Sequence, residues 1–239
     1  MKNLIAAAVT AASLVVAMSN GAQAADRQSG VRSLPGWEAV GRLNISGRNM
    51  CTGTLSASNL VLTAAHCLFD PKSGRPIDAT KIVFEAGLMG SRSKASRGVA
   101  KGVVHPKYQH RRTGTAQMGS DIAVLRLAKP ISTREIRPLE MSWDANRGDA
   151  VGVLSYNYTH ATRPNLEKSC KVLAKQSTTL VMSCQVEFGA SGAPVLQVSP
   201  GRVPTLVSVV SAKAALGSTP VSIGTTLDTS LWKLMRLAG

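Results

Sequence analysis

The sequence is poor in aromatic and acidic side chains. Its 239 residues include only three Trp, three Tyr and three Phe, and 13 Asp and Glu stand against 28 Lys and Arg. A positive charge of this size favours acidic partners such as nucleic acid, anionic lipid or cell-wall polymers. The basic residues are scattered, however, and few rings are present to stack on bases. We therefore expect a solvated basic surface with weak association with anionic surfaces at most, and no specific nucleic-acid site.

Long hydrophobic runs are also missing. The apolar run from Leu4 to Met18 is shorter than the roughly 20 residues needed to cross a bilayer, and no later run is longer. This run follows Lys2 and precedes Ala22-Gln23-Ala24, a small-x-small cleavage site. Residues 1–24 are therefore predicted to be a secretory signal peptide, and the mature protein is predicted to be secreted or periplasmic, without a membrane span.

Cysteine is scarce, and its spacing does not indicate a metal site. All four cysteines follow the predicted signal peptide, and no pair has the short ligand spacing of a structural zinc site, so we expect no metal. Four cysteines in an exported chain fit an oxidising compartment and allow three pairings. The pairing that closes two short local loops, Cys51–Cys67 with Cys170–Cys184, is the one we expect.

Short alternating segments separated by turn residues make up most of the chain, which is typical of an all-β protein. Residues 25–36 begin with a polar stretch that has no apolar periodicity, and are predicted to be a leader or propeptide, with Arg27 and Arg32 as candidate processing sites. Strands are expected at about 39–45, 51–55, 60–63, 81–86, 98–104, 121–127, 150–155, 170–174, 179–186, 193–197 and 206–211, and a short amphipathic helix at 229–237.

Prolines and charges interrupt the strand pattern between residues 128 and 140. This stretch divides the chain into an N-terminal half, about 37–128, and a C-terminal half, about 141–228. No internal repeat relates the two halves in sequence.

The stretch 188–194, Phe-Gly-Ala-Ser-Gly-Ala-Pro, places Ser191 between glycines in an otherwise apolar segment. A small turn there would expose the hydroxyl and aim backbone N–H groups at one spot, which a nucleophile beside an oxyanion hole requires. The same sequence is also typical of an ordinary turn. A matching base and acid elsewhere in the chain would favour the catalytic interpretation.

His66 and Asp121 are the candidates for that base and acid. His66 follows a predicted strand and adjoins Cys67, so a disulfide would hold it firmly; the alternative is a partly buried structural histidine. Asp121 opens a buried strand, where a charge is costly unless it is paired, and an imidazole N–H would be a suitable partner. The alternative for Asp121 is a turn residue. The other histidines have no such context and are interpreted as structural: His105, His110 and His160.

In the order His66, Asp121, Ser191, these motifs resemble those of the chymotrypsin/trypsin family of serine peptidases. Thr-Ala-Ala-His-Cys at 63–67 and Asp-Ile-Ala-Val-Leu at 121–125 match the family's motifs, and 189–194 matches its serine motif with two departures. The resemblance runs from about Trp37 to the terminal helix. It implies a peptidase domain, 37–239, of two packed six-stranded antiparallel β-barrels.

The resemblance also implies a role for each site residue. Ser191 would attack the scissile carbonyl, His66 would take and return its proton, Asp121 would orient the imidazole, and the N–H groups of Gly189 and Ser191 would form the oxyanion hole. Protein or peptide substrates, no cofactor and a monomeric state are expected.

Ala190 departs from the family's pattern. Digestive relatives carry an aspartate there, which pairs with a new N-terminus after zymogen cleavage, and no Ile-Val-Gly-Gly start precedes Trp37 here. Activation through that ion pair is therefore not expected. In this respect the site resembles the bacterial branch that includes glutamyl endopeptidases.

Three further residues are predicted to contact substrate. By the resemblance, Gln185 would lie at the base of the specificity pocket, Ser211 on the strand that binds substrate backbone, and Lys213 near the pocket mouth. Without a carboxylate at the base, a trypsin-like preference for Lys or Arg is not expected. We predict an apolar or acidic residue before the cleaved bond.

Two other functions compete with an endopeptidase. A non-enzymatic protein on a peptidase scaffold would use its basic surface to bind polyanions or the cell envelope, but such relatives usually lack a triad residue, and all three are present here. An esterase on another fold would carry a Gly-x-Ser-x-Gly elbow, which is absent.

Overall fold

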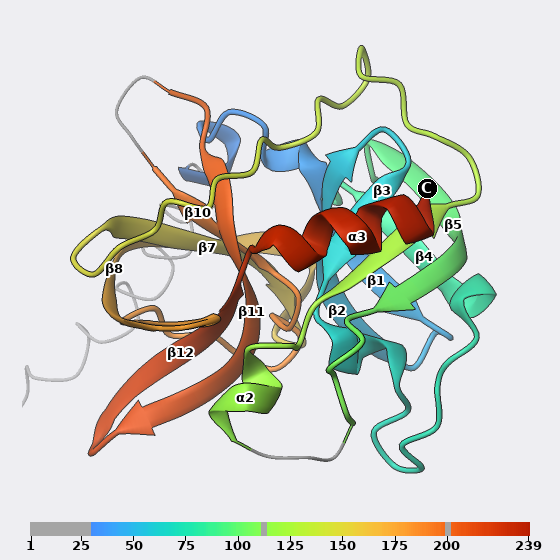
Figure 1. The fold of residues 1–239 in the computed structure, drawn as a ribbon. Coiled ribbons are helices and arrows are strands. Elements are labelled where there is room, and N and C mark those ends of the chain that lie inside the picture. The colour runs from blue at the N-terminus through green and yellow to red at the C-terminus, as the bar shows by residue number, and fades with distance from the viewer. Residues whose placement is uncertain (1–29, 111–113, 199–201) are drawn as a thin grey trace, which may run out of the picture.

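Two closed β-barrels dominate the computed structural model, which describes residues 30–110, 114–198 and 202–239 (Figure 1). Each barrel has six strands paired in antiparallel fashion, so the predicted fold class is confirmed. The predicted signal peptide, Arg27 and the basic residues Arg111 and Arg112 lie outside the described residues.

The first barrel has the strand order β1-β2-β3-β6-β5-β4 and closes by pairing β4 with β1. Its strands are β1 (Val40–Ile45), β2 (Asn49–Ala57), β3 (Leu60–Thr63), β4 (Ile82–Ala86), β5 (Ala95–Val104) and β6 (Ala123–Leu127), and it also contains the 3₁₀ helices η1 (Trp37–Ala39), η2 (Ala65–Leu68) and η3 (Ala79–Lys81) and the helix α2 (Thr115–Met118).

The second barrel has the order β10-β11-β12-β9-β8-β7 and closes by pairing β7 with β10. Its strands are β7 (Ala150–Asn157), β8 (His160–Gln176), β9 (Thr179–Met182), β10 (Pro194–Gln197), β11 (Thr205–Leu216) and β12 (Thr219–Thr226), and the helix α3 (Thr229–Ala238) follows.

Apolar side chains at alternating strand positions fill the interior of the first barrel. In β4, Ile82, Phe84 and Ala86 are buried while the residues between them are partly exposed, as expected where one face of a strand faces a core. Burial of a side chain as large as Phe84 contributes about 1.5–3 kcal/mol. The interior is therefore occupied by side chains, and ligands must bind outside the barrel.

A side chain of the second barrel also packs inside the first. Tyr156 of β7 is fully buried in the core of the first barrel, and its hydroxyl donates a hydrogen bond to the Leu88 carbonyl over 2.9 Å. Burial raises the pKa of Tyr156 above its ordinary value. This buried contact fixes β7 against the first barrel, and with it the cleft between the barrels.

The terminal helix α3 packs on the first barrel although it follows the second in sequence (Figure 1). Asp228 caps its first turn by accepting a hydrogen bond from the Ser230 N–H over 2.8 Å. Leu231 and Leu234 are buried in a cluster that includes residues of β3, β6 and β11. The predicted amphipathic helix is confirmed.

Three segments differ from the sequence-based expectations. β12 and the first ten residues of β8 form strands that were not predicted, because their sequences are polar and rich in turn-forming residues and their pairing comes from neighbouring strands. Val31 was not expected to be part of a core, yet it is fully buried among the core residues of the first barrel.

Candidate active site

Strand pairing brings His66 and Asp121 together. β3 pairs with β6 with Thr63 opposite Ala123, so the residues just after β3 and just before β6 lie at the same end of the barrel. His66 lies there in η2 and Asp121 precedes β6. The two residues are 55 positions apart in sequence, and the pairing of β3 with β6 makes them neighbours.

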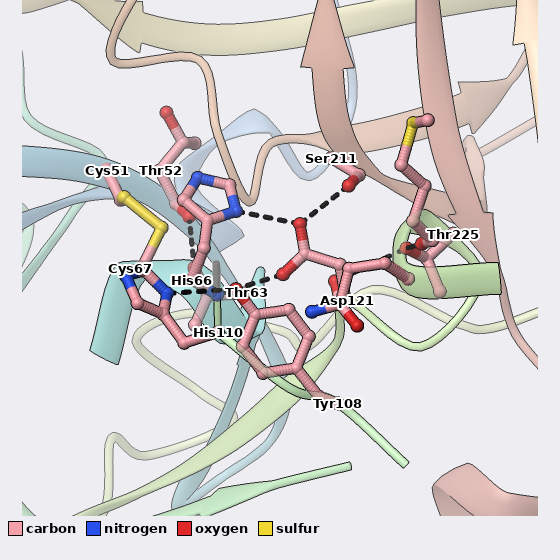
Figure 2. A network of polar contacts seen from close by, with 12 residues as sticks. Cys51, Thr52, Thr63, His66, Cys67, Tyr108, His110, Asp121, Ser211 and Thr225 are labelled. Carbon is pink, nitrogen blue, oxygen red and sulfur yellow. Dashed lines mark hydrogen bonds and ion pairs between the residues drawn. A yellow bond between two sulfur atoms is a disulfide. The ribbon is translucent and has the colours of Figure 1, made fainter. Parts of the chain in front are cut away.

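Asp121 binds His66 through both of its carboxylate oxygens (Figure 2). His66 Nδ1 lies 2.7 Å from Oδ2, and the His66 backbone N–H donates to Oδ1 over 2.9 Å. Ser211 Oγ also donates to Oδ2, over 2.6 Å. Asp121 is only 4% exposed, so its charge is stabilised by these three donors rather than by water.

The protonation of His66 reflects two opposing effects. Burial of the ring lowers the pKa of His66, but the charge of Asp121 and the hydrogen bond to it together outweigh burial, so the pKa lies above its ordinary value. Since the Nδ1 proton is bound to Asp121, Nε2 is the nitrogen left to accept a proton in the neutral ring.

Ser191 lies in the turn before β10 and shares a pocket of about 220 Å³ with His66. No hydrogen bond joins Ser191 Oγ to His66 among the described residues. Such contacts between a nucleophile and its base are often long without substrate and shorten when it binds.

The Ser191 turn is anchored to the first barrel by Thr52. The Thr52 N–H donates to the Ser191 carbonyl over 2.8 Å, and Thr52 Oγ1 lies 3.2 Å from the Gly189 carbonyl oxygen. The Gly192 N–H donates to the Val210 carbonyl over 2.8 Å. A Cβ at Gly192 would collide with the Thr63 hydroxyl and the Thr52 carbonyl, so only glycine allows the turn to approach so closely.

Backbone amides of the same turn are available to a ligand. Within the described chain, the N–H groups of Gly189 and Ser191 donate to no protein acceptor. Gly189 has a φ of 100°, which glycine adopts most readily. Ala190 between them is fully buried. Two free N–H groups beside a serine hydroxyl provide what stabilisation of an oxyanion requires.

The two disulfides are Cys51–Cys67 and Cys170–Cys184, as the short loops predicted. The sulfur atoms of Cys51 and Cys67 lie close to a His66 ring nitrogen, within 4.8 Å. Both sulfurs are used in the disulfide, so this cluster lacks the thiolates that a zinc site requires. Its effect is to fix η2, and therefore His66, against β2.

The three residues predicted to contact substrate lie in different surroundings. Ser211 points at Asp121. Gln185 is exposed and does not line the pocket with Ser191. Lys213 Nζ lies 3.3 Å from Glu187 Oε2 and 5.0 Å from the centre of the Phe188 ring. Their roles in specificity stay predictions.

Sequence reasoning missed Thr52, Tyr158 and Phe188. In sequence, Thr52 is an ordinary strand residue. It anchors the Ser191 turn only because the second barrel packs against it. Tyr158 is 57% exposed and Phe188 73% exposed beside Ser191. Phe188 directly precedes the Gly189 turn, so its position was the one available signal.

A larger hollow of about 730 Å³ lies elsewhere, around His105 and the start of α3. His105 Nε2 lies 3.0 Å from Ser230 Oγ, and Ser230 Oγ in turn contacts Asp228. The Lys107 N–H donates to His105 Nδ1, so the proton of the neutral ring is on Nε2 and points at Ser230. Burial lowers the pKa of His105. His105 therefore donates to Ser230 rather than accepting its proton, and the group supports the Asp228 cap of α3.

Comparisons with known proteins identify relatives by sequence and by fold. A family model described as Trypsin matches residues 29–225. A curated relative named "Trypsin", from Saccharopolyspora erythraea, is 30% identical over 154 residues. The match covers 58% of this chain and 63% of the relative, which is less than two thirds of the relative's length.

Two solved structures are similar in fold. One is a Glu endopeptidase in complex with MPD, with a TM-score of 0.71 and 18% identity, covering 86% of this chain and 92% of the other. The second is the thermostable serine protease AL20 from an extremophilic microorganism, with a TM-score of 0.69 and 17% identity, covering 84% and 96% of the two chains.

Proposed function

Because the chain belongs to the trypsin family of serine peptidases, we propose that it is an exported serine endopeptidase that acts through an acyl-enzyme intermediate. One observation carries this proposal. The buried Asp121 fixes His66 by two hydrogen bonds at the edge of the pocket that also contains Ser191.

In the acylation step, Ser191 Oγ forms a bond to the scissile carbonyl carbon while its proton moves to His66 Nε2. The carbonyl oxygen becomes an oxyanion and accepts hydrogen bonds from the N–H groups of Gly189 and Ser191. The carbon–nitrogen bond then breaks, and His66 gives the proton to the leaving amine. Loss of one oxyanion donor costs about 3 kcal/mol in such sites.

Water completes the cycle. It enters where the amine has left, gives a proton to His66, and bonds to the acyl carbon, after which Ser191 leaves and recovers its proton. Asp121 stays a carboxylate throughout and stabilises the imidazolium form of His66. Its contact with Ser211 keeps Oδ2 in line with Nδ1.

The residue before the cleaved bond is proposed to be apolar or acidic. The proposal rests on the absence of a carboxylate at Gln185, which leaves no partner for a basic substrate side chain. Lys213 lies on β11 two residues after Ser211 and adds no carboxylate there; its own charge is paired with Glu187 over 3.3 Å.

Export, a monomeric state and weak attraction to anionic surfaces are part of the same proposal. Two disulfides support folding in an oxidising compartment, outside the cytoplasm. None of the helices in the described part of the chain has the length and hydropathy needed to span a bilayer.

Replacement of Ser191 by alanine tests the proposal. We expect Ser191→Ala to lower kcat to assay background, a loss of about a million-fold, and to abolish labelling by an active-site phosphonate. Ser218→Ala, at an exposed serine, is the control and should leave both readouts unchanged. Proteolysis that survives Ser191→Ala would contradict the assignment. Heparin binding without phosphonate labelling would favour a non-enzymatic binding protein.

A further inference from the structure

A second hollow adjoins the pocket that contains Ser191. The first pocket, of about 220 Å³, includes Met50, Phe69, Ile77, Tyr158 and Phe188 in its lining. The second, of about 200 Å³, shares Asn49, Met50 and Tyr158 with it and extends to Arg42 and Arg48. The two hollows thus adjoin at these three residues, and Ser191 lines only the first.

The first pocket is apolar and open. Phe188 is 73% exposed and Tyr158 57% exposed, although large apolar side chains of a solvated protein are usually covered. The Met50 N–H donates to the Tyr158 hydroxyl over 3.3 Å, and Lys213 Nζ lies 5.0 Å from the centre of the Phe188 ring. Two exposed rings on one pocket provide an apolar surface for a ligand's side chain.

This pocket lies on the leaving-group side of the proposed reaction. His66 must give its proton to the departing amine, so the chain after the cleaved bond passes beside His66. Cys51 and Cys67, joined next to His66, line the pocket, whereas no residue of β11 does. The chain before the bond would lie towards β11 and Ser211.

The second hollow carries one uncompensated positive charge. Arg42 is neutralised by Glu85, with 2.7 Å between Nε and Oε2, and also donates to the Ala161 carbonyl over 3.1 Å. The exposed guanidinium of Arg48 makes no ion pair or hydrogen bond with any residue that the structure describes. A carboxylate entering this hollow would find Arg48 free to bind it.

We propose that this protein selects its substrates by the residues after the cleaved bond. An apolar side chain at the first or second position enters the pocket of Met50, Phe69, Ile77, Tyr158 and Phe188, and an Asp or Glu within the next two positions binds Arg48. This inference rests on the proposed peptidase function and specifies the peptide class that its site accepts.

The test is cleavage of an unbiased peptide library, with the frequency of each residue scored on both sides of the cleaved bond. The wild-type protein is expected to prefer Leu or Phe over Gly by about tenfold at the first or second position after the bond. It should prefer Asp or Glu over Lys by about fivefold in the next two positions.

Arg48→Glu should reverse the charge preference while leaving the apolar preference in place. Phe188→Ala should weaken the apolar preference, and the fold should be retained because the Phe188 side chain is exposed. Arg134→Glu changes the net charge equally at an exposed residue that lines neither hollow, and it should leave both preferences unaltered. Equal profiles for wild type and Arg48→Glu, or an acidic preference confined to residues before the bond, would overturn the inference.

A binding measurement separates this inference from the proposed function. A fluorescent peptide that contains Leu-Glu-Glu is titrated against two proteins. One is Ser191→Ala, and the other combines Ser191→Ala with Arg48→Glu. Binding at least fivefold weaker to the double variant supports the inference even if the wild-type protein cleaves nothing, in which case the peptidase proposal alone fails. Equal binding to the two proteins would overturn the inference.

Discussion

Asp121 has the most demanding environment of the proposed catalytic residues. It is almost fully buried, and its carboxylate accepts hydrogen bonds from the His66 ring, the His66 backbone and Ser211. A buried carboxylate is tolerated only when its oxygens are paired in this way. The same contacts fix the ring orientation of His66, so the stability of the site and its chemistry depend on one residue.

The pH dependence of activity follows from these contacts. The proposed mechanism needs neutral His66, and the pKa of His66 is raised because Asp121 outweighs burial. Activity should therefore be present above this raised pKa and be lost as the pH falls through it, at a pH higher than an ordinary histidine would give. A pH profile of kcat/KM measures this directly.

Asp121→Asn should shift that acid limb to lower pH. The substitution removes the charge that raises the pKa of His66 and leaves burial, which lowers it. The value of kcat should also fall by about 10⁴-fold, because the imidazole loses its preferred tautomer. An acid limb that does not move in Asp121→Asn would show that another group controls the profile.

Among the elements, the Ser191 turn poses the main structural question, because Ala190 cannot form the ion pair that digestive relatives use. The structure places the anchors elsewhere. Thr52 of β2 holds the Gly189 and Ser191 carbonyls, and the Tyr158 N–H donates to the Phe188 carbonyl over 3.0 Å. The turn is thus fixed by both barrels without a charged group.

Thr52→Val should test this anchoring. Thr52 Oγ1 also accepts a hydrogen bond from the Tyr156 N–H over 3.0 Å, in a buried environment. Loss of the hydroxyl leaves that N–H unpaired, so the free energy of unfolding should fall by about 1–3 kcal/mol. Because the turn carries the proposed oxyanion donors, kcat should fall more than KM rises.

Thr54→Val is the matched control on the same strand. The Thr54 hydroxyl is buried and has no hydrogen-bond partner in the described part of the chain, so its replacement should leave stability unchanged or raise it. Urea unfolding and steady-state kinetics distinguish the two variants. A Thr52→Val protein that behaves like Thr54→Val would contradict the anchoring role.

At the scale of the whole molecule, the barrels depend on segments from outside their own strands. Tyr156 of the second barrel fills the first core, α3 returns to the first barrel, and Val31 is buried before the first strand begins. The site lies between the barrels, so these cross-contacts determine its width.

Val31 gives a test of processing. A chain trimmed after Arg32 loses a fully buried valine, and we expect its free energy of unfolding to fall by about 1.5–3 kcal/mol relative to a chain trimmed after Arg27, which keeps Val31. Urea denaturation of the two forms measures the difference. Equal stability would mean that Val31 contributes nothing to the core.

The sequence by itself determined the fold class, the disulfide pairing and the identity of the candidate catalytic residues, because each depends on local signals. Alternation marked most strands, short loops paired the cysteines, and three motifs identified His66, Asp121 and Ser191. The sequence pattern did not predict the polar strands, β12 and the first ten residues of β8. Those strands form because neighbouring strands pair with them.

Only the tertiary structure decided what surrounds those residues. Thr52 reaches the Ser191 turn, Ser211 points at Asp121, and Arg48 adjoins the apolar pocket because chain segments far apart in sequence meet at the barrel interface. Such contacts depend on how two barrels pack, and no periodicity or motif within a single strand encodes them. The candidate reacting groups were therefore indicated locally, whereas how they are held, and what lies beside them, depended on packing.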